Sequence, residues 1–248
     1  DMAGDAVARA IAAEGIADRS AVYLDRATPS YTAMVDQGGE VVAALADMNL
    51  YEIGFPRQVR RREVRDAVAA ADGLLVDANL PAAALHTLLA AGPKPFAIAV
   101  SPAKAPRLAG VAARLHCLFC NRREAAAIAG PDALGAPAVL VAALRRLGVS
   151  IAVVSDGPRM LVAYAPSETW LFHPPRPRTI SDVTGAGDAL AGAAFLALVE
   201  DAPLVEAVRQ GLAAAVLAVE TPATVPELSA GAFADALERV PPPQRLAD

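Results

Sequence analysis

The residues best suited to chemistry form one short string, Asp-Val-Thr-Gly-Ala-Gly-Asp, at 182–188. It runs into an apolar stretch, 189–199, that predicts a helix. Small residues that open a helix present unpaired N–H groups and the positive end of the helix dipole, which bind anions such as phosphate. Asp188 would repel phosphate, but it can take a proton from a hydroxyl that attacks phosphate. The string is typical of phosphoryl transfer, and the alternative is an ordinary turn with an acidic N-cap.

A second candidate, Asn-Arg-Arg-Glu at 121–124, follows a predicted strand and begins a predicted helix. This spacing puts Asn121 and Glu124 one turn apart on the same helix face. Magnesium keeps several of its waters, so an amide and a carboxylate that act through water can hold it beside phosphate. A capping box, with Asn121 as N-cap and Glu124 as its partner, explains the same two residues equally well.

These residues must be positioned by an alternation of strands and helices that starts near residue 73. Short apolar runs predict buried strands at 73–77, 96–100, 115–120 and 151–155. Helices are predicted between and after them, at 81–91, 122–129, 137–147, 203–219 and 231–240. The alternation indicates a mostly parallel sheet with helices on both faces. Ligands bind at the carboxyl ends of such strands, where we expect Asn121 and Asp188.

Residues 30–46 follow a different pattern, with two extended halves on either side of Gln37-Gly38-Gly39. The glycine pair predicts a hairpin. A hairpin cannot supply a parallel crossover, so we expect it to form a small second sheet that projects from the main one. A lid over a ligand and an edge hairpin without a role are both open at this point.

The composition indicates small-molecule chemistry in one α/β domain. The chain has 248 residues, of which 55% are hydrophobic and only 4% aromatic, so we expect a closely packed core of Ala, Val and Leu. A formal net charge of −5 offers no basic field for nucleic acid or anionic lipid. The longest charge-free apolar runs fall short of the roughly 18 residues that a membrane span needs. Residues 1–5 lack the basic start of a signal peptide, so we expect a cytoplasmic protein.

The two cysteines, Cys117 and Cys120, have the Cys-x-x-Cys spacing of redox and metal sites. However, they lie in a predicted strand, where residues three apart point to opposite faces, and the sequence has no second pair to complete a zinc site. We therefore expect both to pack in the core. The three histidines are scattered singly and form no ligand cluster.

The string at 182–188 resembles the C-terminal signature of the ribokinase-like (PfkB) family of carbohydrate and nucleoside kinases. Asn121 and Glu124 match that family's Asn-x-x-Glu motif. The resemblance implies a ribokinase-like three-layer α/β sandwich, with a mostly parallel central sheet, helices on both faces and a small β lid that includes residues 30–46. In that family the lid covers the acceptor sugar and often forms a homodimer contact.

The same resemblance implies roles for the residues of the string. Asp188 is the expected catalytic base. The anion hole for the transferring phosphoryl group is expected at Gly185, Ala186 and Gly187. Asp182 and the Thr184 carbonyl are expected to hold a monovalent cation such as K+, although the loop at 220–224 that completes this site in related kinases is short here, which leaves the need for the cation open.

ATP and Mg2+ are the cofactors that the resemblance implies. Asn121 and Glu124 are expected to hold Mg2+ through water, and Asn121 also to contact the nucleotide. Ser155 and Gly157, at the end of the strand at 151–155, are expected to approach the ATP phosphates or ribose. The family more commonly has Thr-Leu-Gly at this point, so an ordinary turn remains an equal explanation.

Softer strings at 46–49, 76–80 and 100–104 resemble the pseudouridine kinase branch of the family. The acceptor is therefore expected to be pseudouridine, phosphorylated on its 5′-hydroxyl, with contacts from Thr32, Asn49 and Lys104. Asn49 can both donate and accept hydrogen bonds, as recognition of a uracil edge requires. Another sugar or nucleoside is the alternative acceptor, and a non-catalytic nucleotide- or sugar-binding module is the alternative class of protein.

The resemblance covers residues 1–248 as a single domain. Proteins of this family normally begin with a strand that carries an acceptor-binding Asp, followed by a Gly-Gly…Asn segment. This sequence opens at Asp1-Met2-Ala3-Gly4, which matches a later point of that pattern. We therefore expect the N-terminal strands of the family to be absent from it.

Overall fold

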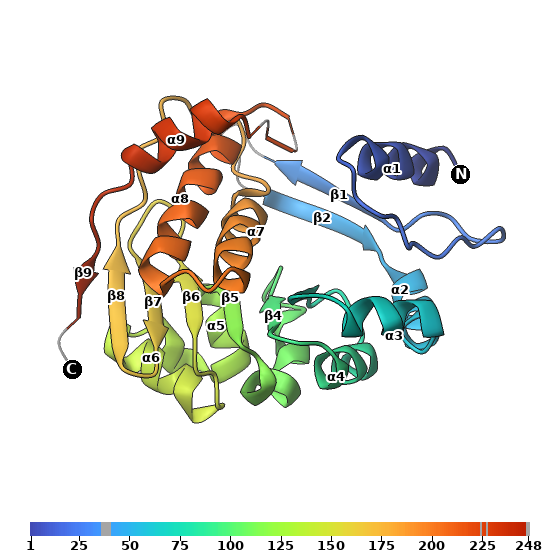
Figure 1. Ribbon diagram of the computed structural model, residues 1–248, viewed down its shortest axis with the longest axis horizontal. Coiled ribbons are helices and arrows are strands. Elements are labelled where there is room, and N and C mark those ends of the chain that lie inside the picture. The colour runs from blue at the N-terminus through green and yellow to red at the C-terminus, as the bar shows by residue number, and fades with distance from the viewer. Residues whose placement is uncertain (36–40, 224, 227, 247–248) are drawn as a thin grey trace.

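The computed structural model describes residues 1–35, 41–223, 225–226 and 228–246. The main sheet of this described part has seven strands in the order β3-β4-β5-β6-β7-β8-β9 (Figure 1). The strands are β3 (Leu74–Asp77), β4 (Pro95–Ile98), β5 (Cys117–Asn121), β6 (Ala152–Ser155), β7 (Leu161–Ala165), β8 (Glu168–Phe172) and β9 (Gln244–Arg245).

The first four strands form the parallel part that the sequence predicts. β3, β4, β5 and β6 pair in parallel, and each lies within two residues of its predicted bounds. β7, β8 and β9 then add antiparallel pairs, which the alternation of strands and helices did not reveal. Neighbouring antiparallel strands need only a short turn, so the β7–β8 hairpin leaves no helix between its strands to mark it.

Helices cover both faces of the sheet and make three layers (Figure 1). One face is covered by α4 (Ala82–Ala91), η1 (Ala105–Arg114), α5 (Arg122–Ala129), η2 (Pro131–Leu134) and α6 (Pro137–Arg146). The other face is covered by α7 (Ala186–Val199), α8 (Leu204–Glu220) and α9 (Ala230–Glu238). The ribokinase-like three-layer sandwich is therefore confirmed.

The central strand β5 shows how alternation divides the core. Leu118 packs in the cluster under α4 and α6, whereas its neighbour Phe119 packs in the cluster under α7 and α8. Cys117 and Cys120 likewise lie on opposite faces, and both are buried free thiols. Burial raises the pKa of each thiol, which keeps it protonated and unreactive. The prediction that both cysteines are core residues is confirmed.

Small residues let α7 and α8 approach closely. Gly211 of α8 lies against α7, where an added Cβ would come within 2.8 Å of the Leu190 carbonyl oxygen and 3.3 Å of the Ala194 Cβ. The buried part of this pair is otherwise mostly Ala, Val and Leu. This packing accounts for a hydrophobic sequence with few aromatic residues.

The described parts of the predicted hairpin, residues 30–35 and 41–47, form a second, two-stranded sheet. β1 (Ser30–Val35) pairs antiparallel with β2 (Val41–Asp47), with Thr32 opposite Leu45. The predicted turn at 37–39 lies outside the described residues. The pair projects from the main body beside three helices (Figure 1), namely α1 (Met2–Ala13), α2 (Asn49–Gln58) and α3 (Arg62–Ala69). Among the described helices, none combines the length and apolar character that a membrane crossing requires.

Candidate active site

The start of α7 has the open backbone that an anion site requires. Gly185 is its N-cap residue with φ of 80°, a left-handed conformation that favours glycine. The amides of Gly185, Gly187 and Asp188 have no hydrogen-bond partner within the described part of the chain, and the Ala186 amide lies 3.4 Å from the Val183 carbonyl oxygen. A Cβ added at Gly187 would meet nothing within 4 Å. A negatively charged group can therefore reach these amides.

Asp182 shapes the loop ahead of this helix. Its Oδ1 accepts a hydrogen bond from the Thr184 amide at 2.8 Å, an Asx turn that sets the direction of the chain into Gly185. The bond to Thr184 holds the pKa of the Asp182 carboxyl below its ordinary value. An ionised, exposed Asp182 is compatible with the cation-binding role expected from the sequence.

Asp188 lies in the first turn of α7 and is open to solvent on one side. The surrounding protein nevertheless removes part of its hydration, which raises the pKa of the carboxyl, and the negative charge of Asp77 raises it further. A raised pKa makes the carboxylate a stronger base while solvent and ligands can still reach it.

The capping box at the start of α5 is present. Asn121 Oδ1 accepts from the Glu124 amide at 2.9 Å, and Glu124 Oε2 accepts from the Asn121 amide at 2.8 Å. Glu124 is only 6% exposed, and burial raises the pKa of its carboxyl, with a further contribution from the charge of Asp188. The structure thus brings Glu124 near Asp188, although 64 positions separate them in the sequence.

The cap leaves part of each side chain available for a ligand. Glu124 Oε1 has no hydrogen-bond partner among the described residues, and it is not sealed from solvent. Within the same residues, no three acidic, histidine or cysteine side chains converge closely enough to hold a metal ion directly. Such a donor set fits a magnesium ion that keeps its waters, with Asn121 and Glu124 in contact through them.

The next strand end brings the predicted nucleotide residues beside Asn121. Ser155, the last residue of β6, is the register partner of Asn121. Gly157 follows with φ of 57°, and a Cβ added there would meet nothing within 4 Å. Sequence reasoning missed Asp156 between them, whose carboxylate binds Arg159 at 2.8 and 2.9 Å and holds this turn. A recess of about 640 Å³ adjoins the turn and is lined by Pro158, His173, Pro174, Pro175, Arg176, Arg239 and Pro241.

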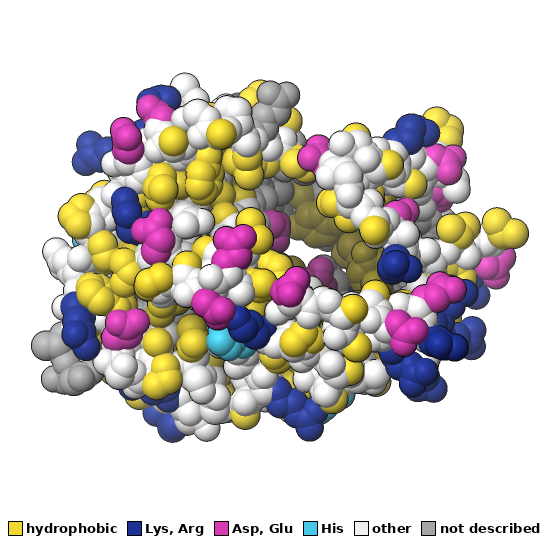
Figure 2. Space-filling view, viewed as in Figure 1, with side chains coloured by type: hydrophobic (Ala, Val, Ile, Leu, Met, Phe, Trp, Pro, Cys, Tyr) yellow, Lys and Arg dark blue, Asp and Glu magenta, His cyan; other side chains and the backbone are white. Residues whose placement is uncertain are grey.

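The residues predicted for the acceptor lie on the lid and at its base. Thr32 is exposed on β1, Asn49 is exposed at the start of α2, and Lys104 is half-buried just before η1. Among the described residues, no hydrogen bond or ion pair joins these three side chains to Asp188. Figure 2 shows a hollow between the main body and the lid, with acidic side chains around it.

Two residues near the site, Asp77 and Arg107, were assigned no role of their own from the sequence. Burial raises the pKa of Asp188 and of Tyr51, and the charge of Asp77, the last residue of β3, lies close enough to raise both further. Its position at a predicted strand end was a usable signal. Arg107 donates to the Asn79 carbonyl at 2.8 Å and to Glu52 Oε1 at 2.6 Å, which ties the β3–α4 turn to the base of the lid. No local pattern could reveal that contact, because 28 and 55 positions separate the partners.

A parallel sheet edge, an open helix start and an adjacent carboxylate together are typical of an α/β phosphotransferase. Comparison with known proteins agrees, because the family described as pfkB family carbohydrate kinase matches residues 1–230. The chain belongs to this family and is a phosphotransferase that acts on a hydroxyl group of a sugar or nucleoside. Membership favours the enzyme over the non-catalytic binding module.

Similar proteins include a pseudouridine kinase from Escherichia coli K12, which is 27% identical over 216 residues, 82% of this chain and 68% of that protein. Among solved structures, a carbohydrate kinase from Agrobacterium tumefaciens is 40% identical, with a TM-score of 0.83 over 99% of this chain and 80% of the other. A ribokinase from Thermotoga maritima is 21% identical, with a TM-score of 0.78 over 96% of this chain and 78% of the other. The last likeness is one of fold.

Proposed function

We propose that the protein transfers the γ-phosphoryl group of ATP to the 5′-hydroxyl of pseudouridine. The observation that carries the phosphoryl-transfer step is the Asp188 carboxylate, with its raised pKa, in the first turn of a helix whose leading amides are open. The likeness to the E. coli pseudouridine kinase supports the choice of acceptor.

In the proposed reaction the acceptor oxygen forms a bond to the γ-phosphorus as the bond to the β–γ bridging oxygen of ATP breaks. Asp188 takes the hydroxyl proton as attack proceeds. The amides of Gly185, Ala186 and Gly187 stabilise the charge on the transferring oxygens, because they are preorganised by the helix start. Asn121 and Glu124 would hold a magnesium ion through water, and the bound ion would neutralise phosphate charge.

The remaining ligand contacts are part of the same proposal. Ser155 and Gly157 approach the nucleotide, and Asp182 with the Thr184 carbonyl holds a monovalent cation. Thr32, Asn49 and Lys104 contact the acceptor. A homodimer through the lid is supported by its exposed apolar side chains Tyr31, Met34, Val42 and Leu45. The cytoplasmic location expected from the sequence stays a prediction.

Two measurements test this proposal. The first is an acceptor panel of pseudouridine, uridine, ribose and fructose at constant MgATP, in which kcat/KM should be highest for pseudouridine. A higher value for ribose or fructose would favour the ribokinase-like alternative and overturn the acceptor assignment.

The second measurement compares Asp188→Asn with the wild type. The amide keeps the shape of the side chain but cannot take the proton, so kcat should fall by about 10²- to 10⁴-fold while ATP affinity stays within a few-fold. Asp132→Asn is the matched control, since Asp132 is an exposed carboxylate that pairs with Arg146. Near-normal turnover of Asp188→Asn would refute the base assignment.

A further inference from the structure

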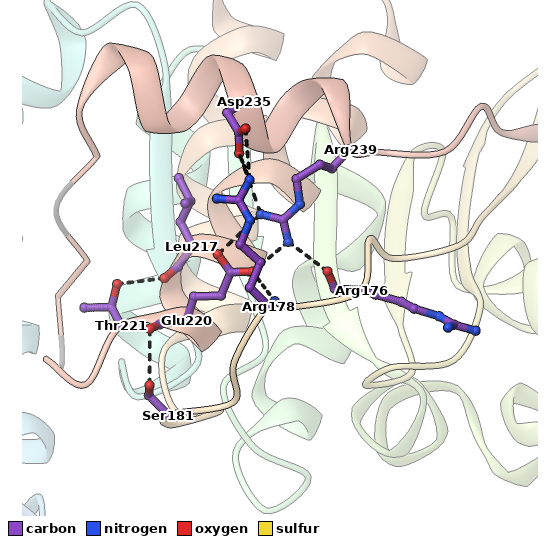
Figure 3. A network of polar contacts seen from close by, with 8 residues as sticks. All are labelled: Arg176, Arg178, Ser181, Leu217, Glu220, Thr221, Asp235 and Arg239. Carbon is purple, nitrogen blue, oxygen red and sulfur yellow. Dashed lines mark hydrogen bonds and ion pairs between the residues drawn. The ribbon is translucent and has the colours of Figure 1, made fainter.

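The segment that leads from β8 to the anion-binding loop, residues 173–185, has no helix or strand of its own. It is held by the C-terminal end of α8 instead (Figure 3). The Ser181 amide donates to the Val219 carbonyl at 2.9 Å, and the Ser181 hydroxyl donates to the Glu220 carbonyl at 3.2 Å. These bonds satisfy carbonyls at the end of α8 that the helix itself leaves unpaired.

The ion pair of Glu220 and Arg239 binds the backbone of the same segment at residues 176–178. Arg239 Nη2 lies 2.6 Å from Glu220 Oε1 and Nη1 lies 3.3 Å from Oε2, so the contact is bidentate. Glu220 Oε1 also accepts from the Arg178 amide at 2.6 Å, and Arg239 Nη2 donates to the Arg176 carbonyl at 2.8 Å. One charge pair therefore fixes the backbone on both sides of Pro177.

The pair is shielded and compensated within the fold. The side chains of Glu220 and Arg239 are 13% and 20% exposed, so their interaction is less weakened by solvent than that of a surface pair. Hydrogen bonding from Arg239 lowers the pKa of the Glu220 carboxyl. Arg178 completes the cluster with two contacts to Asp235, at 2.9 and 3.0 Å. Two cations and two anions balance, so the cluster has no unmatched charge that would call for a ligand.

A few residues of backbone connect this cluster to the proposed phosphoryl-transfer loop at 182–188. The backbone bonds at Arg178 and Ser181 fix the residues just before Asp182, whose Oδ1 in turn orients the Thr184 amide. Gly185 and the first turn of α7 follow directly. Since the reacting groups must be held to a fraction of an ångström, a shift of this segment would be felt at Asp188.

We infer that Glu220, locked by Arg239, is a positioning residue that sets the geometry of the phosphoryl-transfer loop. The inference rests on the proposed role of the loop at 182–188. It assigns Glu220 no contact with ATP or acceptor. Arg239 lines the recess beside the Ser155–Gly157 turn and could touch a nucleotide there, so Glu220 is the residue to vary.

The experiment compares Glu220→Ala, Glu220→Gln and a control, Arg209→Ala. Arg209 lies on the same helix, pairs with Glu206 at 3.1 Å and reaches the Leu237 carbonyl of α9 at 3.4 Å. Among the described residues it makes no hydrogen bond or ion pair with residues 173–185. Both alanine variants remove a tie between α8 and its surroundings. Only Glu220→Ala releases the loop segment.

Three readouts are measured for each variant: kcat and KM for ATP, thermal stability, and amide hydrogen exchange of residues 178–188. Glu220→Ala should lower kcat by roughly 10- to 100-fold and speed exchange at Ser181 and Thr184. Glu220→Gln should recover most of the rate, because its amide oxygen still accepts from the Arg178 amide. Arg209→Ala should leave kcat and that exchange near wild-type values, and it should lower thermal stability less than Glu220→Ala does, because the Arg209–Glu206 pair is more exposed.

The inference is overturned if Glu220→Ala and Arg209→Ala lower kcat equally, or if exchange at 178–188 does not respond to Glu220→Ala. Failure of the proposed function is a separate result. In that case wild-type protein phosphorylates no acceptor of the panel or Asp188→Asn keeps its turnover, whereas the exchange comparison still decides whether Glu220 positions the segment.

Discussion

The capping box at Asn121 and Glu124 allows one pair of substitutions to separate a structural from a functional role. Glu124→Gln keeps a side-chain oxygen that can accept from the Asn121 amide, and glutamine serves in capping boxes as well as glutamate does. It removes only the negative charge. Glu124→Ala removes both the negative charge and the accepting side-chain oxygen. The Asn121 amide then lacks the acceptor that lies 2.8 Å away in the wild type.

The expected stability changes follow from these contacts. An unsatisfied, partly buried N–H costs about 1–3 kcal/mol, which for a chain of this size lowers Tm by roughly 2–12 °C. We expect a loss in that range for Glu124→Ala. Glu124→Gln should match or exceed the wild-type Tm at pH 7, because burial raises the pKa of the wild-type carboxyl and so disfavours its charge. Thermal unfolding without nucleotide or metal measures both.

The functional change should not follow stability. Both variants lack the carboxylate that is proposed to hold hydrated magnesium, so each should need about 10- to 100-fold more Mg2+ for half-maximal rate. The assay is ATP turnover against Mg2+ concentration at saturating acceptor. Glu206→Gln, which alters a carboxylate of α8 paired with Arg209, should leave the Mg2+ requirement unchanged. An unchanged Mg2+ requirement in Glu124→Gln would refute the metal role, and a Tm loss equal to that of Glu124→Ala would refute the capping analysis.

Two further predictions concern the packing of α7 and the titration of Asp188. Gly211→Ala should lower the free energy of unfolding by roughly 1–3 kcal/mol, because the new Cβ would come within 2.8 Å of the Leu190 carbonyl oxygen. Chemical denaturation measures this loss. An unchanged free energy of unfolding would show that α7 and α8 can move apart at no cost. The raised pKa of Asp188 means that its stabilising contribution is complete below its unfolded pKa and is lost as pH rises through the native pKa. Asp188→Asn should therefore gain stability over the wild type as pH rises from 4 to 8, and the reverse trend would contradict the assigned direction of the shift.

Much of the fold could be read from local patterns. Short apolar runs between helical stretches predict the strands β3 to β6, because a strand that is buried on both faces needs apolar residues throughout. The opposite-facing cysteines follow from the two-residue period of a strand. β7 and β8 were missed because they form a hairpin with no helix between its strands to mark it, and β9 was missed because it pairs with a strand more than 70 positions away.

The candidate site divides in the same way. The open amides before α7 and the reciprocal cap at Asn121 and Glu124 arise within four residues of sequence, so the backbone geometry of a helix start determines them. Burial raises the carboxyl pKa values of Asp188 and Glu124, and the charges of Asp77 near Asp188 and of Asp188 near Glu124 raise them further; both effects required the fold to bring distant segments together. The ion pair of Glu220 and Arg239 on the 176–178 backbone likewise joins segments up to 63 positions apart. The sequence by itself determined the local groups that can bind phosphate and accept a proton, because short hydrogen-bonded turns need only neighbouring residues. Tertiary structure alone decided which charges those groups feel and what holds their loop, because electrostatic and packing energies depend on distance in space.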